Sequence, residues 1–352
     1  METQALEFFK RIIETPSPSG YERPAQEIVR QYAASFSDEV TTDVHGNVMA
    51  VRNPGARLRV MLAGHCDQIG FLVRYIDNDG FLYLQAIGGW DPQIVVGQKM
   101  TVWTAEGPLA GVIARKPLHL LSEEERKQVA KLRDLWVDIG AKDQADAAAR
   151  VRVGDPVTLE LRYRELLNER ASGPGMDDKT GLWIVFEALR RAGLGQLKCA
   201  LYAVSTVQEE IGLRGSKTSA YRINPYIGIA VDVCHASDSP SIEKKHEGDI
   251  ALDKGPVIYR GPNMNPRLVE RLIEAAKARE IPYQLAGYGP ASSTDANAIQ
   301  ITRAGVAAGL IGVPNRYMHS PVETVSLRDL DRAADLLAAF ALALEGHEDL
   351  TP

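Results

Sequence analysis

Residues 177–207 read DDKTGLWIVFEALRRAGLGQLKCALYAVSTV, and the prediction of the fold starts from their alternation of patterns. The first half predicts a helix, because Leu182, Val185, Phe186 and Leu189 recur at the spacing that places them on one face. Residues 198–207 form a short and nearly continuous apolar run, which is typical of a parallel strand buried on both faces. A helix followed directly by a buried strand indicates an α/β fold.

The same alternation recurs further along the chain. Residues 226–233 (YIGIAVDV) and 306–313 (VAAGLIGV) are apolar runs that we expect to form buried strands. Residues 266–280 and 328–345 have the apolar spacing of helices. We therefore predict a three-layer α/β sandwich with a mixed central sheet.

Between residues 70 and 165 the pattern changes. Short β-like runs such as GFLVRYID and GFLYLQAIGG alternate with Gly and Pro, and one charged stretch at 122–134 (SEEERKQVAKLRD) is expected to be helical. Loops whose ends lie close together tolerate insertions. We therefore expect residues 70–165 to form a small inserted β-rich, barrel-like domain. Residues 1–69 and 166–352 would then form one discontinuous main domain.

Composition excludes several classes of protein. The chain has 352 residues, of which 45% are hydrophobic and 24% charged, close to the globular average. A net charge of −6 argues against nucleic-acid binding, and no apolar run approaches the roughly 18 residues of a membrane span. Cys66, Cys199 and Cys234 are scattered and odd in number, and the acidic start does not resemble a signal peptide. We therefore expect a cytoplasmic protein that binds neither nucleic acid nor membranes.

Polar residues that could bind a metal ion stand where the predicted strands end. Ligand sites form at this edge of open α/β sheets. Taken singly, each residue has a simpler explanation: a structural histidine, a helix N-cap or a solvated pair of carboxylates. Adjacent buried carboxylates repel each other unless positive charge lies nearby, and one metal cluster explains all of the positions together. Two histidines with several carboxylates suit Zn²⁺ or a similar ion. The candidate ligands are His65, Asp177, Glu210, Asp232 and His319.

Several ordered segments resemble the M42 family of metallo-aminopeptidases, and the resemblance covers nearly the whole chain. They are IIETPSPSGYE, AGHCDQIGFLV, LWVDIGAKD, RVGDPV, DDKTG, VQEEIGLRGS, AVDVCHASD, SSTDANAIQ and YMHSPVE. The resemblance implies a pair of metal ions bridged by Asp177, which would have a strained peptide bond to Asp178. His65 and Asp232 would complete one metal site. Glu210 and His319 would complete the other.

Two further residues receive roles from the resemblance. Glu209 would be the general base on a metal-bridging water, and Asp67 would orient the ligand His65. Both roles are physically reasonable. One carboxylate of the pair Glu209-Glu210 can face a metal and the other its water, and a carboxylate two residues after a histidine can support its ring.

The function implied is a metal-dependent aminopeptidase that acts on peptides with a free N-terminus. It would use two divalent ions, Zn²⁺, Co²⁺ or Mn²⁺, and its preferred N-terminal residue stays open. The main alternative is a deacylase or carboxypeptidase of the same clan acting on N-acylated amino-acid derivatives. A glycosidase would need two carboxylates and no metal, and an inactive scaffold would need no ligand set. The resemblance also implies that residues 70–165 make dimer contacts and that dimers assemble into dodecamers.

Overall fold

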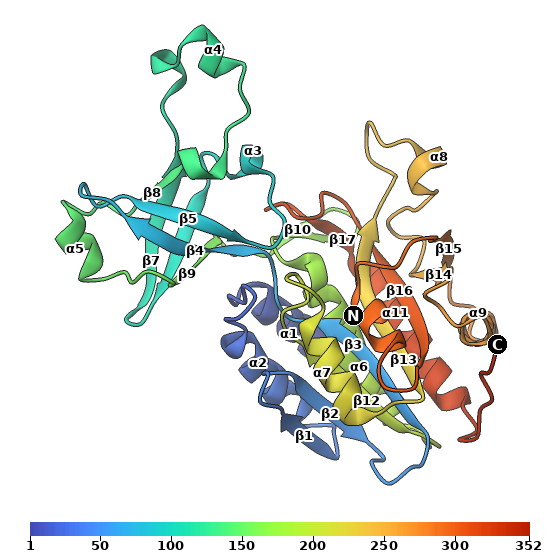
Figure 1. Ribbon diagram of the computed structural model, residues 1–352. Helices are drawn as coiled ribbons and strands as arrows, with labels where there is room; N and C mark the ends of the chain where they lie inside the picture. Colours follow the sequence, from blue (N-terminus) through green and yellow to red (C-terminus); the bar gives the residue numbers. More distant parts are fainter.

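The computed structural model describes residues 1–352, and its main domain is built on a mixed eight-stranded sheet (Figure 1). In spatial order the strands are β1 (Glu39–Thr42), β2 (Val48–Arg52), β12 (Ala200–Thr206), β3 (Arg59–His65), β13 (Ile227–His235), β16 (Ala307–Asn315), β14 (Val257–Arg260) and β15 (Gln284–Gly287). The four central strands, from β12 to β16, are parallel to one another. β1, β2 and β14 add antiparallel pairs, so the predicted mixed sheet is confirmed.

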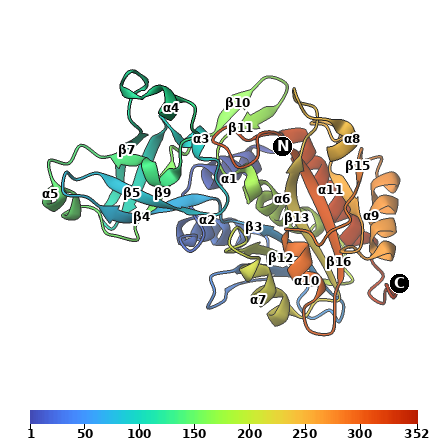
Figure 2. The same ribbon diagram turned by 45° about the horizontal axis from the view of Figure 1, so that its top comes forward.

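Helices cover both faces of this sheet. They are α1 (Thr3–Ile13), α2 (Arg23–Ala33), α6 (Met176–Ala192), α7 (Arg214–Ile223), α9 (Pro266–Ala278), α10 (Asp295–Gln300) and α11 (Leu327–Ala343). α6 lies across β12, β3 and β13 and packs against α1 and α11. α7 and α10 contact each other and the opposite face (Figure 2). The predicted three-layer sandwich is therefore confirmed. None of the helices combines the length and the apolar character that a membrane span requires.

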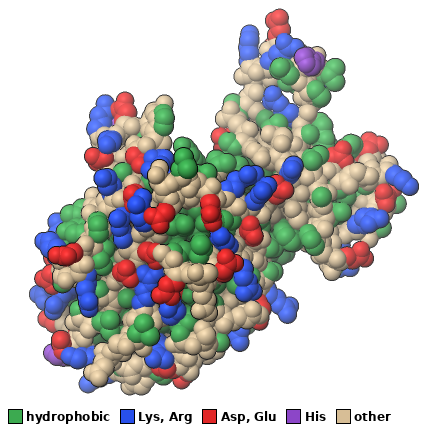
Figure 3. All heavy atoms as spheres, turned by 180° about the vertical axis from the view of Figure 1, so that it is seen from behind, with side chains coloured by type: hydrophobic (Ala, Val, Ile, Leu, Met, Phe, Trp, Pro, Cys, Tyr) green, Lys and Arg blue, Asp and Glu red, His purple; other side chains and the backbone are tan.

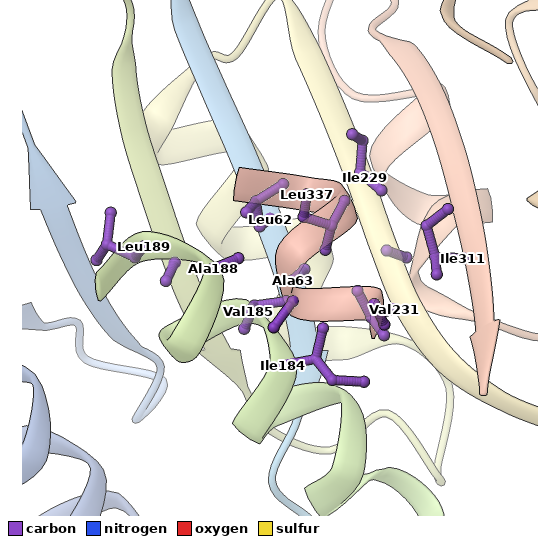
Figure 4. Close-up of a cluster of buried hydrophobic side chains, with 14 of the residues drawn as sticks. Leu62, Ala63, Ile184, Val185, Ala188, Leu189, Ile229, Val231, Ile311 and Leu337 are labelled. Atoms are coloured by element: carbon purple, nitrogen blue, oxygen red, sulfur yellow. The ribbon is translucent and has the colours of Figure 1, made fainter. Parts of the chain in front are cut away.

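The core of the sandwich lies between α6 and the sheet. Ile184, Val185, Ala188 and Leu189 of α6 face the central strands, and Leu62 lies on β3 behind the helix (Figure 4). They belong to one cluster of 62 buried residues. α6 is buried along nearly its whole length. This burial explains why apolar residues recur throughout residues 177–193.

β3 and α6 approach each other most closely at Gly64. A Cβ atom at this position would lie 2.4 Å from the backbone carbon of Gly181 and the backbone nitrogen of Leu182. No other residue type fits there without separating strand from helix. The contact fixes the start of α6 directly behind the end of β3.

The segment predicted as an insertion contains a closed six-stranded barrel that stands apart from the sandwich (Figure 1). Its strands are β4 (Gly70–Ile76), β5 (Leu82–Ile87), β6 (Lys99–Thr104), β7 (Gly107–Ala114), β8 (Trp136–Asp138) and β9 (Pro156–Leu159). They enclose a separate core of 15 buried residues. Three short helices lie in its loops: α3 (Pro92–Val95), α4 (Glu123–Arg126) and α5 (Gln144–Ala148). The expectation of a β-rich, barrel-like unit is confirmed.

The helix expected over residues 122–134 is much shorter than predicted. α4 covers only Glu123–Arg126, and a single 3₁₀ turn follows at Leu132–Asp134. Ser122 and Glu125 form a capping box, which explains the start of the helix. No residue of α4 is buried, so no apolar face is available to extend it.

The remaining elements lie around the sandwich. A three-stranded sheet joins β10 (Arg164–Leu166) and β11 (Arg170–Ser172) to β17 (Thr324–Ser326), and α8 (Lys244–Glu247) lies in the connection after β13. Seen from behind, the surface of the sandwich carries Lys and Arg side chains interspersed with Asp and Glu (Figure 3). No single-sign region dominates that face.

Candidate metal centre

Four of the predicted site residues lie at one edge of the central sheet. His65 is the last residue of β3, Asp232 lies near the end of β13, and Glu209 and Glu210 follow β12. The three strands are parallel neighbours, so their carboxyl ends meet at the same edge. Sheet order therefore brings together residues that lie far apart in the sequence.

The other two candidate ligands come from loops that flank this edge. Asp177 stands in the first turn of α6, where its peptide bond to Asp178 is cis, and His319 lies in the loop after β16. Asp177 Oδ1 is 3.2 Å from His65 Nε2, and Asp177 Oδ2 is 3.2 Å from His319 Nε2. A single carboxylate thus lies between two imidazoles, with one oxygen directed at each.

The donor atoms form two groups of three that could each hold a metal ion, namely His65, Glu209 and Asp232, and Asp177, Glu210 and His319. His65 Nε2 lies 3.7 Å from Glu209 Oε2 and 3.9 Å from Asp232 Oδ1. His319 Nε2 lies 3.5 Å from Glu210 Oε2. Each group combines one imidazole with two carboxylates, a donor set that suits Zn²⁺ or a similar divalent ion.

The charges of this cluster fit the binding of cations. Burial raises the pKa of Glu209 and Glu210 well above the usual range and raises that of Asp232 to about 8. Burial acts to lower the pKa of His65, but Glu209 and the other carboxylates around the ring raise it further than burial lowers it. Glu210 Oε1 is buried without a hydrogen-bond partner. Crowded carboxylates and an orphaned acceptor are what divalent ions would compensate.

Asp67 holds the cluster through its backbone and its side chain. Its backbone carbonyl accepts a hydrogen bond from His65 Nδ1 at 3.0 Å, whereas its carboxylate Oδ1 lies 3.6 Å from that nitrogen. The carboxylate instead accepts the backbone N–H groups of Glu209 and Glu210 at 3.0 and 3.2 Å, and the hydroxyl of Ser19 at 2.6 Å. Asp67 thereby ties the end of β3 to the loop after β12.

Sequence reasoning missed Glu323, although it lies within the quoted segment YMHSPVE. Its side chain is buried, and its two oxygens accept the backbone N–H groups of Asp177 at 3.1 Å and of His319 at 2.8 Å. Asp178 has a similar positioning role, because its carboxylate accepts hydrogen bonds from the backbone N–H groups of His65 and Gly181 at 3.2 and 2.9 Å. The Asp178 carboxylate thus caps the helical turn that follows the kink at Asp177 and Asp178. The available signal was the nearness of each carboxylate to a candidate ligand in the sequence, since Glu323 follows His319 by four residues and Asp178 follows Asp177 directly.

A loop of the inserted segment and a turn before α2 also reach the centre. The carbonyl of Gly89 lies 3.0 Å from His319 Nδ1. Trp90 holds this loop, because its indole N–H donates to the carbonyl of Gly70 at 2.9 Å. Glu22 accepts the N–H of Gln208 at 3.1 Å, and burial raises the pKa of Glu22 to about 7.

A cavity of about 790 Å³ opens onto the cluster. Asp177, Glu209, Glu210, Asp232 and His319 line it on one side. Residues 288 and 292–294 line it elsewhere, so the polar loop after β15 forms part of the pocket wall. Cys66 and Cys234 are buried free thiols. A buried carboxylate cluster beside a pocket of this size is typical of a metal-dependent hydrolase built on an α/β sandwich.

Comparisons with known proteins assign the family. The profile described as M42 glutamyl aminopeptidase matches residues 46–336. The lysyl aminopeptidase of Pyrococcus furiosus is 38% identical over 352 residues, which cover 98% of this chain and 99% of that protein. The glutamyl aminopeptidase of Lactococcus lactis is 28% identical and covers 95% of each chain. This chain belongs to the M42 family of aminopeptidases, and the predicted enzyme class is confirmed.

Solved structures agree with this assignment. A TET aminopeptidase from a marine-sediment Thaumarchaeota archaeon has a TM-score of 0.92 at 35% identity and covers 97% of this chain and 96% of its own. The TET1 peptidase of Pyrococcus horikoshii has a TM-score of 0.86 at 31% identity and covers 97% of this chain and all of its own (100%). The similarity extends over the sandwich and the inserted barrel together.

Proposed function

We propose that this chain is a metal-dependent aminopeptidase with a dinuclear centre, which releases N-terminal amino acids from peptides. The position of the Asp177 carboxylate between the rings of His65 and His319 carries the proposal. Asp177 would bridge two ions, with Asp232 and Glu210 as the additional carboxylate ligands. Zn²⁺, Co²⁺ or Mn²⁺ in such a pair would supply Lewis acidity for the peptide carbonyl and for the attacking water.

Glu209 is the residue that we propose moves the proton. Its side chain is buried, and its carboxylate lies on the His65 side of the cluster. Its backbone N–H donates a hydrogen bond to the carboxylate of Asp67. In this role a carboxylate oxygen of Glu209 takes the proton of the attacking water and passes it to the leaving amine. Burial raises the pKa of Glu209, which makes its carboxylate a stronger base for this proton than an exposed carboxylate would be.

Two variants of the adjacent carboxylates separate a base from a ligand. Glu209 is also close enough to His65 and Asp232 to serve as a ligand. If it is the base, Glu209→Gln should retain both metals and lose activity by roughly 100- to 10,000-fold. Glu210→Gln, the matched change one residue away, should lose metal at the His319 site. Metal loss in Glu209→Gln, or full activity of the metal-replete variant, would refute the assignment.

A substrate panel tests the reaction itself. Chelation should abolish hydrolysis of aminoacyl anilides, and Zn²⁺, Co²⁺ or Mn²⁺ should restore it. Anilides with a free α-amine should be cleaved, whereas their N-acylated counterparts should not. Cleavage of the N-acylated compounds alone would indicate the deacylase or carboxypeptidase of the same clan.

We further propose that the segment of residues 70–165 is a dimerisation domain and that the enzyme works as a homo-oligomer of dimers. The barrel stands apart from the sandwich, and the structure of the relative from Pyrococcus horikoshii is described as assembling into a tetrahedron or a large octahedral shell. Another similar structure, that of PhTET1-12s, is a dodecamer. Three free, buried cysteines support a reducing, cytoplasmic location. Light scattering should give a mass near twelve chains, and an active monomer would refute the assembly.

A further inference from the structure

The cavity beside the candidate metal centre has charged side chains at one side only. Its acidic residues are Asp177, Glu209, Glu210 and Asp232, all of which belong to the centre. No Lys or Arg is among the 20 residues that line it. Apart from the candidate ligand His319, the one lining imidazole is His235, an exposed residue at the end of β13. Away from the candidate metal centre, the cavity offers neither a carboxylate nor a permanent cation.

The rest of the wall is apolar or carries neutral hydrogen-bonding groups. The apolar and aromatic part includes Leu213, Tyr259, Tyr288, Leu310 and Met318. Tyr259 and Tyr288 pack edge to face with ring centres 6.4 Å apart, which makes one side of the wall aromatic. The neutral polar groups come from residues 292–294 and from Asn297 on α10. At about 790 Å³, the cavity has room for a large side chain.

This distribution decides which N-terminal residues can bind. In the proposed reaction the α-amine and the scissile carbonyl lie at the metal centre, so the first side chain must lie in the cavity. A charged side chain would lose water there without gaining a counter-ion, which disfavours its binding. An apolar side chain instead gains free energy from each CH₂ group that it buries.

We infer that the enzyme selects peptides whose N-terminal residue has a large uncharged side chain, such as Leu, Met or Phe. This inference rests on the proposed aminopeptidase function. It separates the chain from the two relatives above whose names specify lysyl and glutamyl substrates. The same wall disfavours both acidic and basic N-terminal side chains, because neither finds an oppositely charged group outside the candidate metal ligands.

Kinetics on a panel of anilides tests the inference. With metal-replete enzyme, kcat/KM for Leu- and Met-anilides should exceed that for Lys- and Glu-anilides by at least about tenfold. A charged substrate that is cleaved best would overturn it. Calorimetric binding of free leucine, lysine and glutamate gives a second readout that needs no turnover. If no anilide is cleaved but leucine binds best, the proposed reaction fails while the selectivity stands; if lysine or glutamate binds best, the selectivity fails.

Asn297→Asp provides a directed test. It adds one negative charge to the wall at nearly constant shape, so the ratio of Lys to Leu cleavage should rise by about tenfold or more. Asn78→Asp makes the same chemical change at an exposed turn of the barrel and should leave the ratio unchanged. Ser293→Asp, also on the wall, serves if the first variant does not fold. An unchanged ratio in an active, metal-replete wall variant would overturn the inference.

Discussion

Glu323 joins two candidate ligands of one metal site. One oxygen accepts the N–H of Asp177 and the other accepts the N–H of His319, and the side chain is 2% exposed. Burial and the neighbouring Asp177 raise the pKa of Glu323, whereas the N–H donors act to lower it. His319 has a positive φ of 59°, a backbone conformation that needs support from its surroundings. Removing the Glu323 carboxylate should therefore disturb the ligand geometry.

The size of the effect follows from these two hydrogen bonds. A hydrogen bond to a charged acceptor contributes about 1.5–3 kcal/mol. Glu323→Gln keeps one carbonyl oxygen but replaces the other acceptor with an NH₂ group, which faces a backbone N–H. One bond of this kind is lost, and the buried N–H is left without a partner. If the whole loss of 1.5–3 kcal/mol falls on metal binding, the ion at this site binds roughly 10- to 150-fold more weakly.

Metal titration against a competing chelator measures this loss. In Glu323→Gln the ion held by Asp177, Glu210 and His319 should dissociate at lower chelator concentration, while the other ion is affected less. Glu106→Gln is the matched control, because Glu106 is exposed on the barrel and has no side-chain partner. Denaturant unfolding of the metal-free proteins separates lost stability from lost affinity. Wild-type affinity at both sites, together with wild-type stability, would refute the positioning role.

Three further changes have expected outcomes. Gly64→Ala places a Cβ 2.4 Å from the backbone of Gly181, so urea unfolding should show a loss of about 1–3 kcal/mol or more, and an unchanged midpoint would contradict this close packing. Burial raises the pKa of Glu22 from 4.5 to about 7, so ionisation of this group lowers the stability of the folded state as the pH rises through that range. Relative to wild type, Glu22→Gln should therefore gain about 3 kcal/mol between pH 4.5 and 7, and parallel pH profiles would disprove it. Trp90→Ala should loosen the loop that contacts His319 and weaken metal binding there by about tenfold, measured by the same titration, and unchanged affinity would count against the contact.

Much of the fold could be predicted because the sandwich repeats a simple pattern. The apolar run at residues 198–207 contains β12, and the helical spacing at 177–193 corresponds to α6. The strand order of the barrel could not be predicted in the same way. β8 lies between β5 and β7, and its pairing with β5 rests on Leu82 opposite Val137, two residues far apart in the chain. Sequence pattern reports which side chains are buried but not which strands pair.

The candidate site was predictable to a different extent. Residues of the ligand type stood at the ends of predicted strands, and all of them lie together in the structure. Glu323 was missed, and the bond of Asp178 to the His65 N–H was not foreseen, because their partners are backbone N–H groups, which leave no mark in the sequence. The overlong helix at 122–134 has the opposite cause. Charged helix formers were present there, but α4 has no buried face to stabilise a longer helix.

The inserted barrel takes part in the candidate metal centre through Gly89. A carbonyl can only accept a hydrogen bond, so His319 Nδ1 must donate, which leaves Nε2 directed at Asp177 and free to bind an ion. A Cβ at position 89 would lie 3.4 Å from Nδ1, so the ring is also packed against this loop. If residues 70–165 make the subunit contacts, as proposed, then the loop of Gly89 would connect those contacts to the ring of His319. Assembly and metal binding would then be coupled by one hydrogen bond, at the ligand that is the more exposed of the two histidines.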